Sequence, residues 1–436
     1  MRIDKKFLCL IVMACVCSVS VAQTNGINSP YSRYGFGQLS EMNVGRSAAM
    51  GGVAMGLRSG QEINIANPAA YSACDSLTFL LDAAVVLQNA NFNNGPKAVN
   101  AKNAAFDHVV MQFRAFKNVG MAFGFMPFSK AGYDFGNTMP SISAVDGTTI
   151  TPYMNYAGNG NISVGFIGIG AQPIKGFSIG ANFGYMFGDI EHTVTNSYSD
   201  SYVYSNIRSY SSSISTYKLD LGTQVELPVG KHDKLTVGAS YTLGHDIKSD
   251  AIRSDYLYNT STSLTESFAS DTLKNAFQLP QMFSVGMAYN HNNKLTVAVD
   301  YSMQKWGDVR YPMTSNSSFV SQKGFMKDRS RLSLGMEYVP NFMSRKFFNR
   351  VRYRLGAYYT NQYASPTVEK AGKEYGLSVG FGIPISNLYN GKSVVNISGQ
   401  WAHVEPGVNS LIKENYLRIC VGITFNERWF MKWKVE

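Results

Sequence analysis

Residues 417–425 read LRICVGITF, and neighbouring residues in this stretch alternate in polarity. Apolar residues occupy one face of the extended chain, namely Leu417, Ile419, Val421, Ile423 and Phe425. The other face carries Arg418, Cys420, Gly422 and Thr424. This period of two predicts a β-strand with one apolar side. In a soluble β-sandwich that side faces the core, whereas in an outer-membrane barrel it faces lipid and the mixed side lines the lumen.

The composition favours membrane strands. Charged residues make up 16% of the 436 residues, well below the ~25% of a typical soluble domain. The mean hydropathy of −0.12 is low for a helical membrane protein, in which each span needs ~20 apolar residues. The formal net charge is +10, but the basic residues are scattered through turns and loops, as expected near anionic head groups. A nucleic-acid partner is therefore not predicted.

The pattern predicts fourteen strands, an even number, as in single-chain bacterial barrels. They lie near residues 76–88, 104–116, 119–134, 150–171, 177–195, 207–227, 234–250, 273–290, 294–306, 327–339, 350–363, 373–385, 392–403 and 414–425. Very short turns, such as 117–118, follow even-numbered strands, and long polar loops, such as 193–206 and 249–271, follow odd-numbered ones. A β-sandwich has no reason to separate its loops in this way. We therefore predict an all-β fold, a 14-stranded antiparallel transmembrane β-barrel over residues 76–425, followed by a periplasmic C-terminal tail at 426–436.

The first residues predict export. A basic start, MRIDKK, precedes a short apolar run and the small-x-small sequence Ser20-Val21-Ala22, which is typical of a cleaved signal peptide over residues 1–22. A lipoprotein signal ending at Cys15 is the alternative. The predicted location is the cell outer membrane, in contact with lipid and lipopolysaccharide.

Residues 23–75 do not follow the strand pattern. They are rich in Gly, Ala, Ser and Asn, yet they carry isolated apolar residues such as Tyr34, Phe36 and Ile65 that need shelter. A fourteen-stranded barrel is too wide for its own side chains to fill. We therefore predict that residues 23–75 form an N-terminal hatch that plugs the lumen.

Several stretches resemble the FadL/TodX family of outer-membrane transporters of hydrophobic compounds. GRSAAMGGVAMGLRSGQEINIANPAAYS, at 45–72, is similar to the family's N-terminus, and SIGANFGYMFGDIE, at 178–191, extends the match. The C-terminal LIKENYLRICVGITFNERWFMKWK resembles the divergent branch of this family in Bacteroidetes-type bacteria. The family's Asn-Pro-Ala hatch motif corresponds to Asn67, Pro68 and Ala69.

The resemblance implies a function. It implies a FadL-like channel for passive uptake of hydrophobic small molecules, of the long-chain fatty acid or hydrocarbon type, through a plugged lumen with a lateral exit. The family's lateral gate, at a kink in the third strand, maps to the neighbourhood of Gly124 and Pro127. The alternative for Pro127 is a strand end or a bulge. Some relatives are non-transporting partner barrels in secretion or outer-membrane assembly complexes, so a protein partner in the membrane is the alternative function.

Alternation also predicts polar side chains that face the lumen. These are Asp82, His108, Gln112, Arg114 and Arg418. A charge on the lipid face is costly, so Asp82 is expected to point inward, where it either pairs with Arg418 of the last strand or holds the hatch.

No pattern of reactive residues predicts an enzyme. No two of the six His have metal-ligand spacing, so no metal and no cofactor are predicted. Ser178, in the sequence GFSIG, matches a nucleophile elbow, but no helix is expected to follow it. The two cysteines outside the signal peptide, Cys74 and Cys420, are expected to be unpaired because they lie at different heights.

Overall fold

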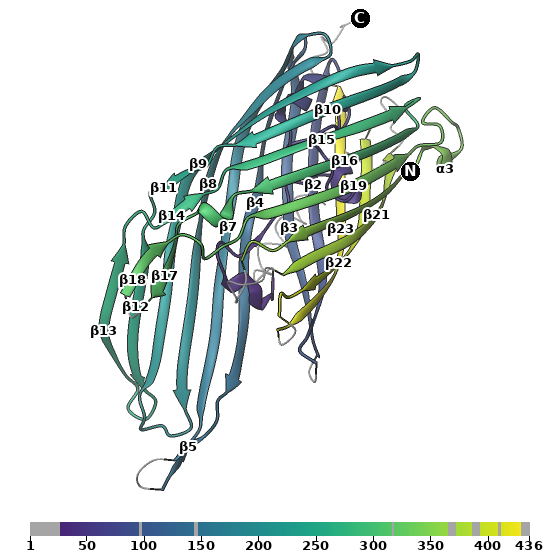
Figure 1. The fold of residues 1–436 in the computed structure, drawn as a ribbon. Coiled ribbons are helices and arrows are strands. Elements are labelled where there is room, and N and C mark those ends of the chain that lie inside the picture. Colours follow the sequence, from purple (N-terminus) through teal and green to yellow (C-terminus); the bar gives the residue numbers. More distant parts are fainter. Residues whose placement is uncertain are drawn as a thin grey trace, which may run out of the picture.

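In the computed structural model, the described residues are 27–95, 98–143, 147–315, 318–364, 372–385, 393–408 and 411–428. Most of them belong to one antiparallel sheet that curls into a barrel (Figure 1). The strands of its wall are β2 (Thr78–Asn93), β3 (Ala98–Phe116), β4 (Val119–Thr138), β7 (Pro152–Ile174), β8 (Phe177–Tyr198), β9 (Ser205–Val229), β10 (Asp233–Thr242), β15 (Met282–His291), β16 (Leu295–Gln304), β19 (Arg329–Tyr338), β20 (Arg352–Asn361), β21 (Lys373–Ile385), β22 (Ser393–Glu405) and β23 (Lys413–Arg428).

The barrel is closed by its first and last strands. Each wall strand pairs with the next one along the chain, and β2 pairs with β23 from Thr78 opposite Arg428 to Asn93 opposite Lys413. The predicted fourteen-stranded antiparallel barrel is therefore confirmed. All fourteen predicted strands correspond to wall strands, and β21 has the predicted bounds.

Alternation along the strands separates an apolar exterior from the lumen. In β8, Phe183, Tyr185 and Phe187 are exposed, whereas the neighbouring Asn182 and Met186 are buried. In β23, Leu417, Ile419 and Val421 are likewise exposed. Exposed apolar side chains on successive strands form a belt that suits contact with lipid.

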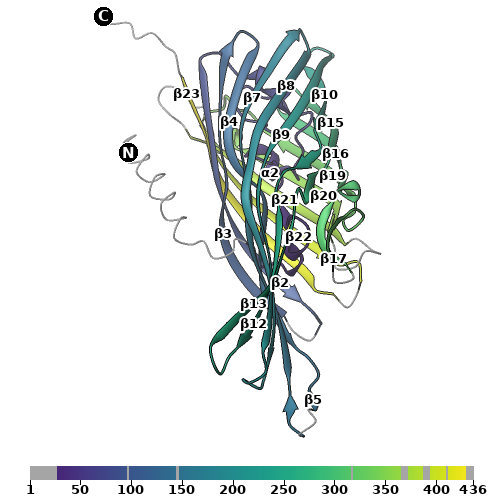
Figure 2. The same ribbon diagram turned by 90° about the vertical axis from the view of Figure 1, so that its left-hand side faces the viewer.

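One side of the barrel is much longer than the other. Strands β4, β7, β8 and β9 extend far beyond the short wall strands β10, β15, β16, β19 and β20, towards the bottom of Figures 1 and 2. The segment 249–271, predicted to be a polar loop, instead forms most of a hairpin of β12 (Ala251–Asn259) and β13 (Leu264–Leu273). Strand β12 pairs with residues 205–211 of β9, because β10 pairs only with residues 220–229 and leaves that edge open.

The remaining elements are small. They are η1 (Pro30–Arg33), β1 (Gln38–Leu39), α2 (Arg46–Ala49), η2 (Pro68–Ala73), β5 (Ile142–Ser143), β6 (Thr149–Ile150), β11 (His245–Ile247), β14 (Phe277–Leu279), η3 (Trp306–Asp308), β17 (Tyr311–Ser315), β18 (Ser318–Gln322) and α3 (Phe347–Arg350). None of the helices in the described part of the chain has the length and hydropathy needed to cross a bilayer.

Residues 27–75, the N-terminal segment, lie inside the barrel (Figure 2). Many of the apolar residues of this segment are fully buried, including Phe36, Met50, Ile65 and Tyr71. The predicted signal peptide at 1–22 and residues 429–436 of the predicted tail lie outside the described residues.

Candidate functional site

The predicted hatch motif lies against strands β8 and β9. The Asn67 side chain caps η2 by accepting a hydrogen bond from the Ala69 amide at 3.2 Å, and it donates to the carbonyls of Met55 and Thr223 at 3.0 Å each. Pro68 occupies the first position of η2, where a missing amide hydrogen costs nothing. A Cβ atom at Gly180 of β8 would lie 2.4 Å from the Pro68 carbonyl carbon, so only glycine allows this close approach. The motif thus anchors the segment to the wall.

Further along η2, side chains continue this anchorage. The Tyr71 hydroxyl donates to Asn182 Oδ1 at 3.0 Å, and Asn182 donates in turn to the Ile65 carbonyl. Ser178, the residue that matched a nucleophile elbow, is buried and hydrogen-bonded to Ser72 and Arg58. Its contacts are therefore those of an anchor between the segment and β8.

The wall between β3 and β4 is incomplete. The β3–β4 ladder runs from Phe116 opposite Val119 up to Val109 opposite Phe125 and stops there. Strand β3 nevertheless continues to Ala98, paired on its other edge with β2. Strand β4 continues to Thr138, paired on its other edge with β7. We call the unzipped part, residues 98–108 of β3 and 126–138 of β4, the seam.

Both predicted gate residues lie where the seam begins. Gly124 pairs with Val110 in the last part of the β3–β4 ladder. Pro127 is buried, and the β4–β7 register shifts between Pro127 and Ser129, which marks a β-bulge. A proline cannot donate to a ladder, and a bulge bends its strand, so both features favour separation of the two strands here.

The N-terminal segment occupies the free edge of β4. Strand β1 pairs with β4, with Gln38 opposite Lys130 and Leu39 opposite Ser129. The Ser40 amide donates to the Phe128 carbonyl at 2.8 Å, and the Gly132 amide donates to Ser32 Oγ at 3.1 Å. Residues 32–40 therefore take the place that β3 leaves empty.

One side chain also spans the seam. Lys130 Nζ donates to the Phe106 carbonyl of β3 at 3.2 Å. Asn28 of the N-terminal segment also reaches β3, with its Nδ2 3.4 Å from Asn103 Oδ1. The seam is thus covered by short polar contacts and a two-residue strand.

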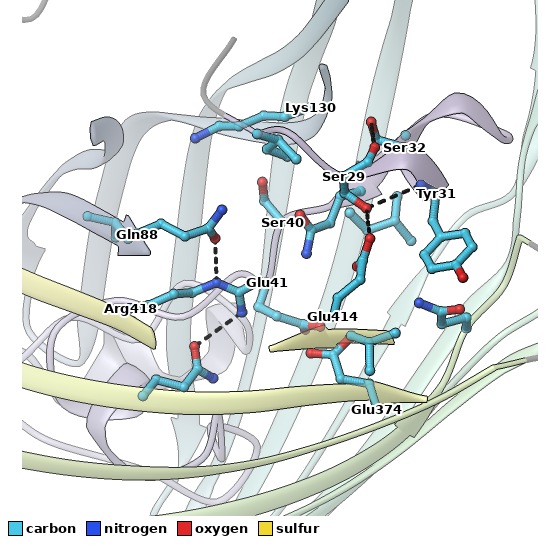
Figure 3. Close-up of a pocket in the computed structure, with 18 of the residues that line it drawn as sticks. Ser29, Tyr31, Ser32, Ser40, Glu41, Gln88, Lys130, Glu374, Glu414 and Arg418 are labelled. Carbon is cyan, nitrogen blue, oxygen red and sulfur yellow. Dashed lines mark hydrogen bonds between the residues drawn. The ribbon is translucent and has the colours of Figure 1, made fainter. Parts of the chain in front are cut away.

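A cavity of about 230 Å³ lies behind the seam (Figure 3). Its polar lining comes from the N-terminal segment and from several wall strands and includes Ser29, Ser40, Glu41, Gln88, Asp107, Lys130, Arg329, Arg331, Glu374, Glu414 and Arg418. Apolar side chains, including Ile27, Leu39, Val86 and Val404, complete the lining. The cavity therefore has both apolar and charged walls.

A second cavity, of about 120 Å³, lies beside Met126, Pro127 and Phe128 of β4. The two cavities share lining residues, among them Leu39, Ser40, Glu41 and Arg331. Strand β1 and the residues just after it therefore lie between the two spaces.

Two ion pairs fix the charge beside the larger cavity. Glu41 Oε1 accepts from Arg329 at 2.5 Å and from Arg331 at 2.8 Å. Burial raises the pKa of Glu41, but the two guanidinium groups outweigh burial and lower the pKa to about 2. Glu41 is therefore ionised at neutral pH.

The predicted lumen-facing residues fall into separate places. Asp82 Oδ1 lies 2.7 Å from His108 Nε2, and Asp82 Oδ2 accepts from Thr424 at 2.5 Å. Arg418 lies in the cavity and donates to Gln88 at 2.8 Å. Of the two alternatives for Asp82, the pair with Arg418 does not form, because the β2–β23 register places Arg418 opposite Gln88, six residues along β2 from Asp82.

The other two predicted residues are near the short-turn end. Gln112 is buried, with its Nε2 3.5 Å from the Tyr71 carbonyl. Arg114 donates to Ser76 Oγ at 2.8 Å and to the Phe116 carbonyl at 3.2 Å. Its side chain lines neither of the two cavities. Cys74 and Cys420, the two cysteines among the described residues, are free thiols. The described residues contain no group of three His, Cys, Asp or Glu arranged to hold a metal ion.

The residues that hold the N-terminal segment most firmly on the far wall were not singled out from the sequence. Arg354 of β20 is fully buried and donates to Glu62 at 2.6 Å and to Glu337 at 2.7 Å. Arg352 also reaches Glu62 at 2.6 Å, and Arg46 of α2 reaches Glu337 at 2.7 Å. Alternation in 329–338 and 352–361 places these charges inward, but only the structure shows that Glu62 meets them.

The BamG family model matches residues 3–436. Among solved structures, the P. putida toluene transporter TodX has a TM-score of 0.61 at 14% identity, with 90% of this chain and 100% of that chain covered. The CymD monoaromatic hydrocarbon channel has a TM-score of 0.60 at 15% identity, covering 90% and 99%.

A Pseudomonas aeruginosa FadL homologue is similar to the same extent, with a TM-score of 0.58 at 12% identity and coverage of 90% and 100%. At such low identity these likenesses show a shared fold, which confirms the FadL-like architecture. A comparison with curated protein sequences found no match.

Proposed function

The chain belongs to the BamG family, and for this member we propose an outer-membrane channel through which a hydrophobic small molecule passes passively and leaves sideways at the seam. The observation that carries the proposal is the early end of the β3–β4 ladder at Val109 and Phe125. A closed barrel in lipid normally pairs all of its strand edges. An unzipped stretch backed by a cavity is what a lateral exit requires.

The lining of the cavity suggests the class of ligand. The similar solved structures are described as channels for toluene and monoaromatic hydrocarbons and as a FadL homologue. Apolar residues such as Val86 and Leu39 suit an oily body, and burial of apolar area favours binding by ~25 cal/mol per Å². Lys130 and Arg418 suit a polar or anionic end. An amphipathic molecule, such as a long-chain fatty acid, matches both parts.

The N-terminal segment acts in this proposal as the hatch. Its Asn67-Pro68-Ala69 turn stays fixed on β8 and β9, while residues 32–40 swing away from β4 to open the seam. Opening breaks the β1–β4 pairing and the contacts of Ser32 and Ser40. It also moves Phe36, which is buried against Trp306. The Gly35 and Gly37 carbonyls, which accept hydrogen bonds from Tyr311 and Tyr363, move with it. Each such hydrogen bond contributes about 1 kcal/mol net, and the proposed motion uses no energy source.

The second candidate is a non-transporting partner barrel in a secretion or outer-membrane assembly complex. The observation that favours it is the network of buried ion pairs around Glu62, Arg354 and Glu337, which ties the N-terminal segment to the wall. A lumen filled in this way suits a scaffold whose exterior or loops dock another protein.

Uptake measurements separate the two candidates. A strain that lacks the gene is compared with the complemented strain for entry of labelled long-chain fatty acid and of toluene, and the tagged protein is purified under mild conditions. The channel proposal expects reduced entry of one ligand in the deletion strain and full recovery on complementation. Unchanged entry of both ligands, together with a stoichiometric protein partner, would establish the second candidate instead.

A further inference from the structure

The connection between β19 and β20, residues 339–351, differs from the other described turns at its end of the barrel. Other described hairpins at this end turn within a few residues, as at 117–118 and 292–294. Residues 339–351 instead form an ordered loop that contains α3 and stands out beside the end of β19 (Figure 1). We call this segment the α3 loop. Short turns mark the periplasmic end of an outer-membrane barrel, so the α3 loop lies on that side.

The α3 loop exposes four large apolar side chains. Phe342 is 63% exposed, Met343 79%, Phe347 45% and Phe348 73%. Exposure of such a cluster to water is unfavourable. Contiguous exposed apolar groups therefore mark contact sites for a membrane or a partner.

The polar residues of the same loop hold it in shape. The Asn341 amide donates to the Asn349 carbonyl at 2.8 Å, and the Asn341 side chain accepts from the Met343 amide at 3.0 Å. The Ser344 hydroxyl accepts from the Lys346 amide and from Asn349. The apolar side chains are therefore presented by a fixed scaffold.

The charge of the loop has one sign. Between Val339 and Val351 the basic residues are Arg345, Lys346 and Arg350, and there is no Asp or Glu. Arg345 and Lys346 are exposed. Aromatic side chains beside free cations match the boundary of a bilayer that contains anionic phospholipid, where rings settle at head-group level and cations meet phosphate.

The loop also continues the lipid-facing exterior of the wall. Tyr338 of β19 and Tyr353 of β20 are register partners, and the Tyr353 ring meets Phe381 of β21 edge-on. The Tyr353 hydroxyl donates to the Phe348 carbonyl at 3.1 Å. The exposed apolar residues of the α3 loop therefore begin where the aromatic rim of the belt ends.

We propose that the α3 loop is a membrane anchor that lies in the head-group region of the periplasmic leaflet and binds anionic phospholipid there. Phe342, Met343, Phe347 and Phe348 enter the interface, and Arg345 and Lys346 hold the phosphate groups. This contact fixes the height and tilt of the β19–β20 side of the barrel. A docked periplasmic protein is the other occupant that such a loop would suit, and the charge and the continuity with the belt favour lipid.

Site-directed spin labelling of the whole barrel in nanodiscs tests the proposal. In a background of Cys74→Ala and Cys420→Ser, a nitroxide is placed at Met343→Cys or, as the control in a short turn of the same end, at Asn292→Cys. The collision rates of the nitroxide with oxygen and with a water-soluble nickel complex report the depth of the label in the bilayer. We expect the label at 343 to favour oxygen several-fold more than the label at 292 does. We also expect phosphatidylglycerol, added to phosphatidylcholine, to increase that preference.

Charge reversal gives the second arm. Arg345→Glu with Lys346→Glu is expected to abolish the effect of phosphatidylglycerol at 343 while the barrel keeps its heat-modifiable migration on a gel. If the label at 343 meets the nickel complex as freely as the label at 292 in both lipids, the loop is not in the membrane. That result would overturn the proposal and leave a protein as its occupant.

Discussion

Two parts of the wall, which lie opposite each other across the lumen, hold the N-terminal segment in different ways. At β4 the contacts are backbone pairs of β1 and single hydrogen bonds of Ser32 and Ser40. At β19 and β20 the contacts are charged, and the side chains of Glu62 and Arg354 that make them are nearly inaccessible to water. Backbone pairing can be exchanged one bond at a time, whereas separating buried charges is costly. The difference indicates a fixed side and a movable side.

The largest effect is expected from breaking the fixed side. Glu62→Gln leaves Arg352 and Arg354 without a full counter-charge in a buried place, so we expect a loss of about 3–5 kcal/mol in the free energy of unfolding. Urea unfolding in lipid vesicles measures it. Asp246→Asn, which removes an exposed pair with Arg310, is the control and is expected to cost about 0–1 kcal/mol. Equal losses in the two variants would remove the distinction between the sides.

Acid should weaken the fixed side over a defined range. Burial raises the pKa of Glu62, but Arg352, Arg354 and Arg46 outweigh it and lower the pKa from 4.5 to about 2. A depressed folded-state pKa contributes stability that is full above the unfolded value and is lost as the pH falls through the folded value. The difference in the free energy of unfolding between wild type and Glu62→Gln should therefore stay constant from pH 7 to about 4.5. It should then shrink by about 3 kcal/mol towards pH 2. A gap that stays constant over this range would show that Glu62 does not titrate in this way.

On the movable side, a paired comparison of glycines isolates the contact between residues 32–40 and β4. Gly37 and Gly324 have φ values of +84° and +82°, so valine is strained by about 1–2 kcal/mol at either. Only at Gly37 would a Cβ atom also lie 2.4 Å from a backbone atom, the Lys130 carbonyl oxygen. We expect Gly37→Val to cost about 1–3 kcal/mol more than Gly324→Val, and to make a cysteine at Leu39 more reactive to a water-soluble maleimide.

The smallest expected effect concerns the start of the seam. Pro127→Ala restores a backbone donor, so the β3–β4 ladder should lengthen and gain about 1 kcal/mol at most. Hydrogen exchange of the amides near 107–109 should slow severalfold, and uptake should fall modestly. Pro384→Ala in β21 is the control, since Pro384 pairs with Val394 of β22 and lies away from the seam. Unchanged exchange at 107–109 would mean that Pro127 only accommodates the bulge.

The wall could be predicted from the sequence because alternation is a local signal. In a stretch such as 417–425, alternation alone shows which residues face the lipid and which face the lumen. Fourteen such strands predict a closed barrel. The covering of the seam could not be predicted, because β1 is only two residues long and no pattern in 32–40 marks it as a strand. It pairs there because β4 has a free edge. Likewise, the charges of β19 and β20 were visible as inward-facing residues, but Glu62 meets them only through the path of the N-terminal segment.

A reversible lock on the movable side tests directly whether the ligand leaves through the seam. Leu39 and Ser129 are antiparallel partners, and a disulfide needs a Cα–Cα separation of roughly 4.4–6.8 Å. Cysteines at both positions, Leu39→Cys with Ser129→Cys, are therefore placed to form one. Ligand uptake is measured in the oxidised and the reduced state, with Leu39→Cys alone as the control. If the ligand leaves through the seam, uptake falls to the level of the deletion strain when the disulfide forms and returns on reduction. Equal uptake by the locked and unlocked protein would contradict exit through the seam.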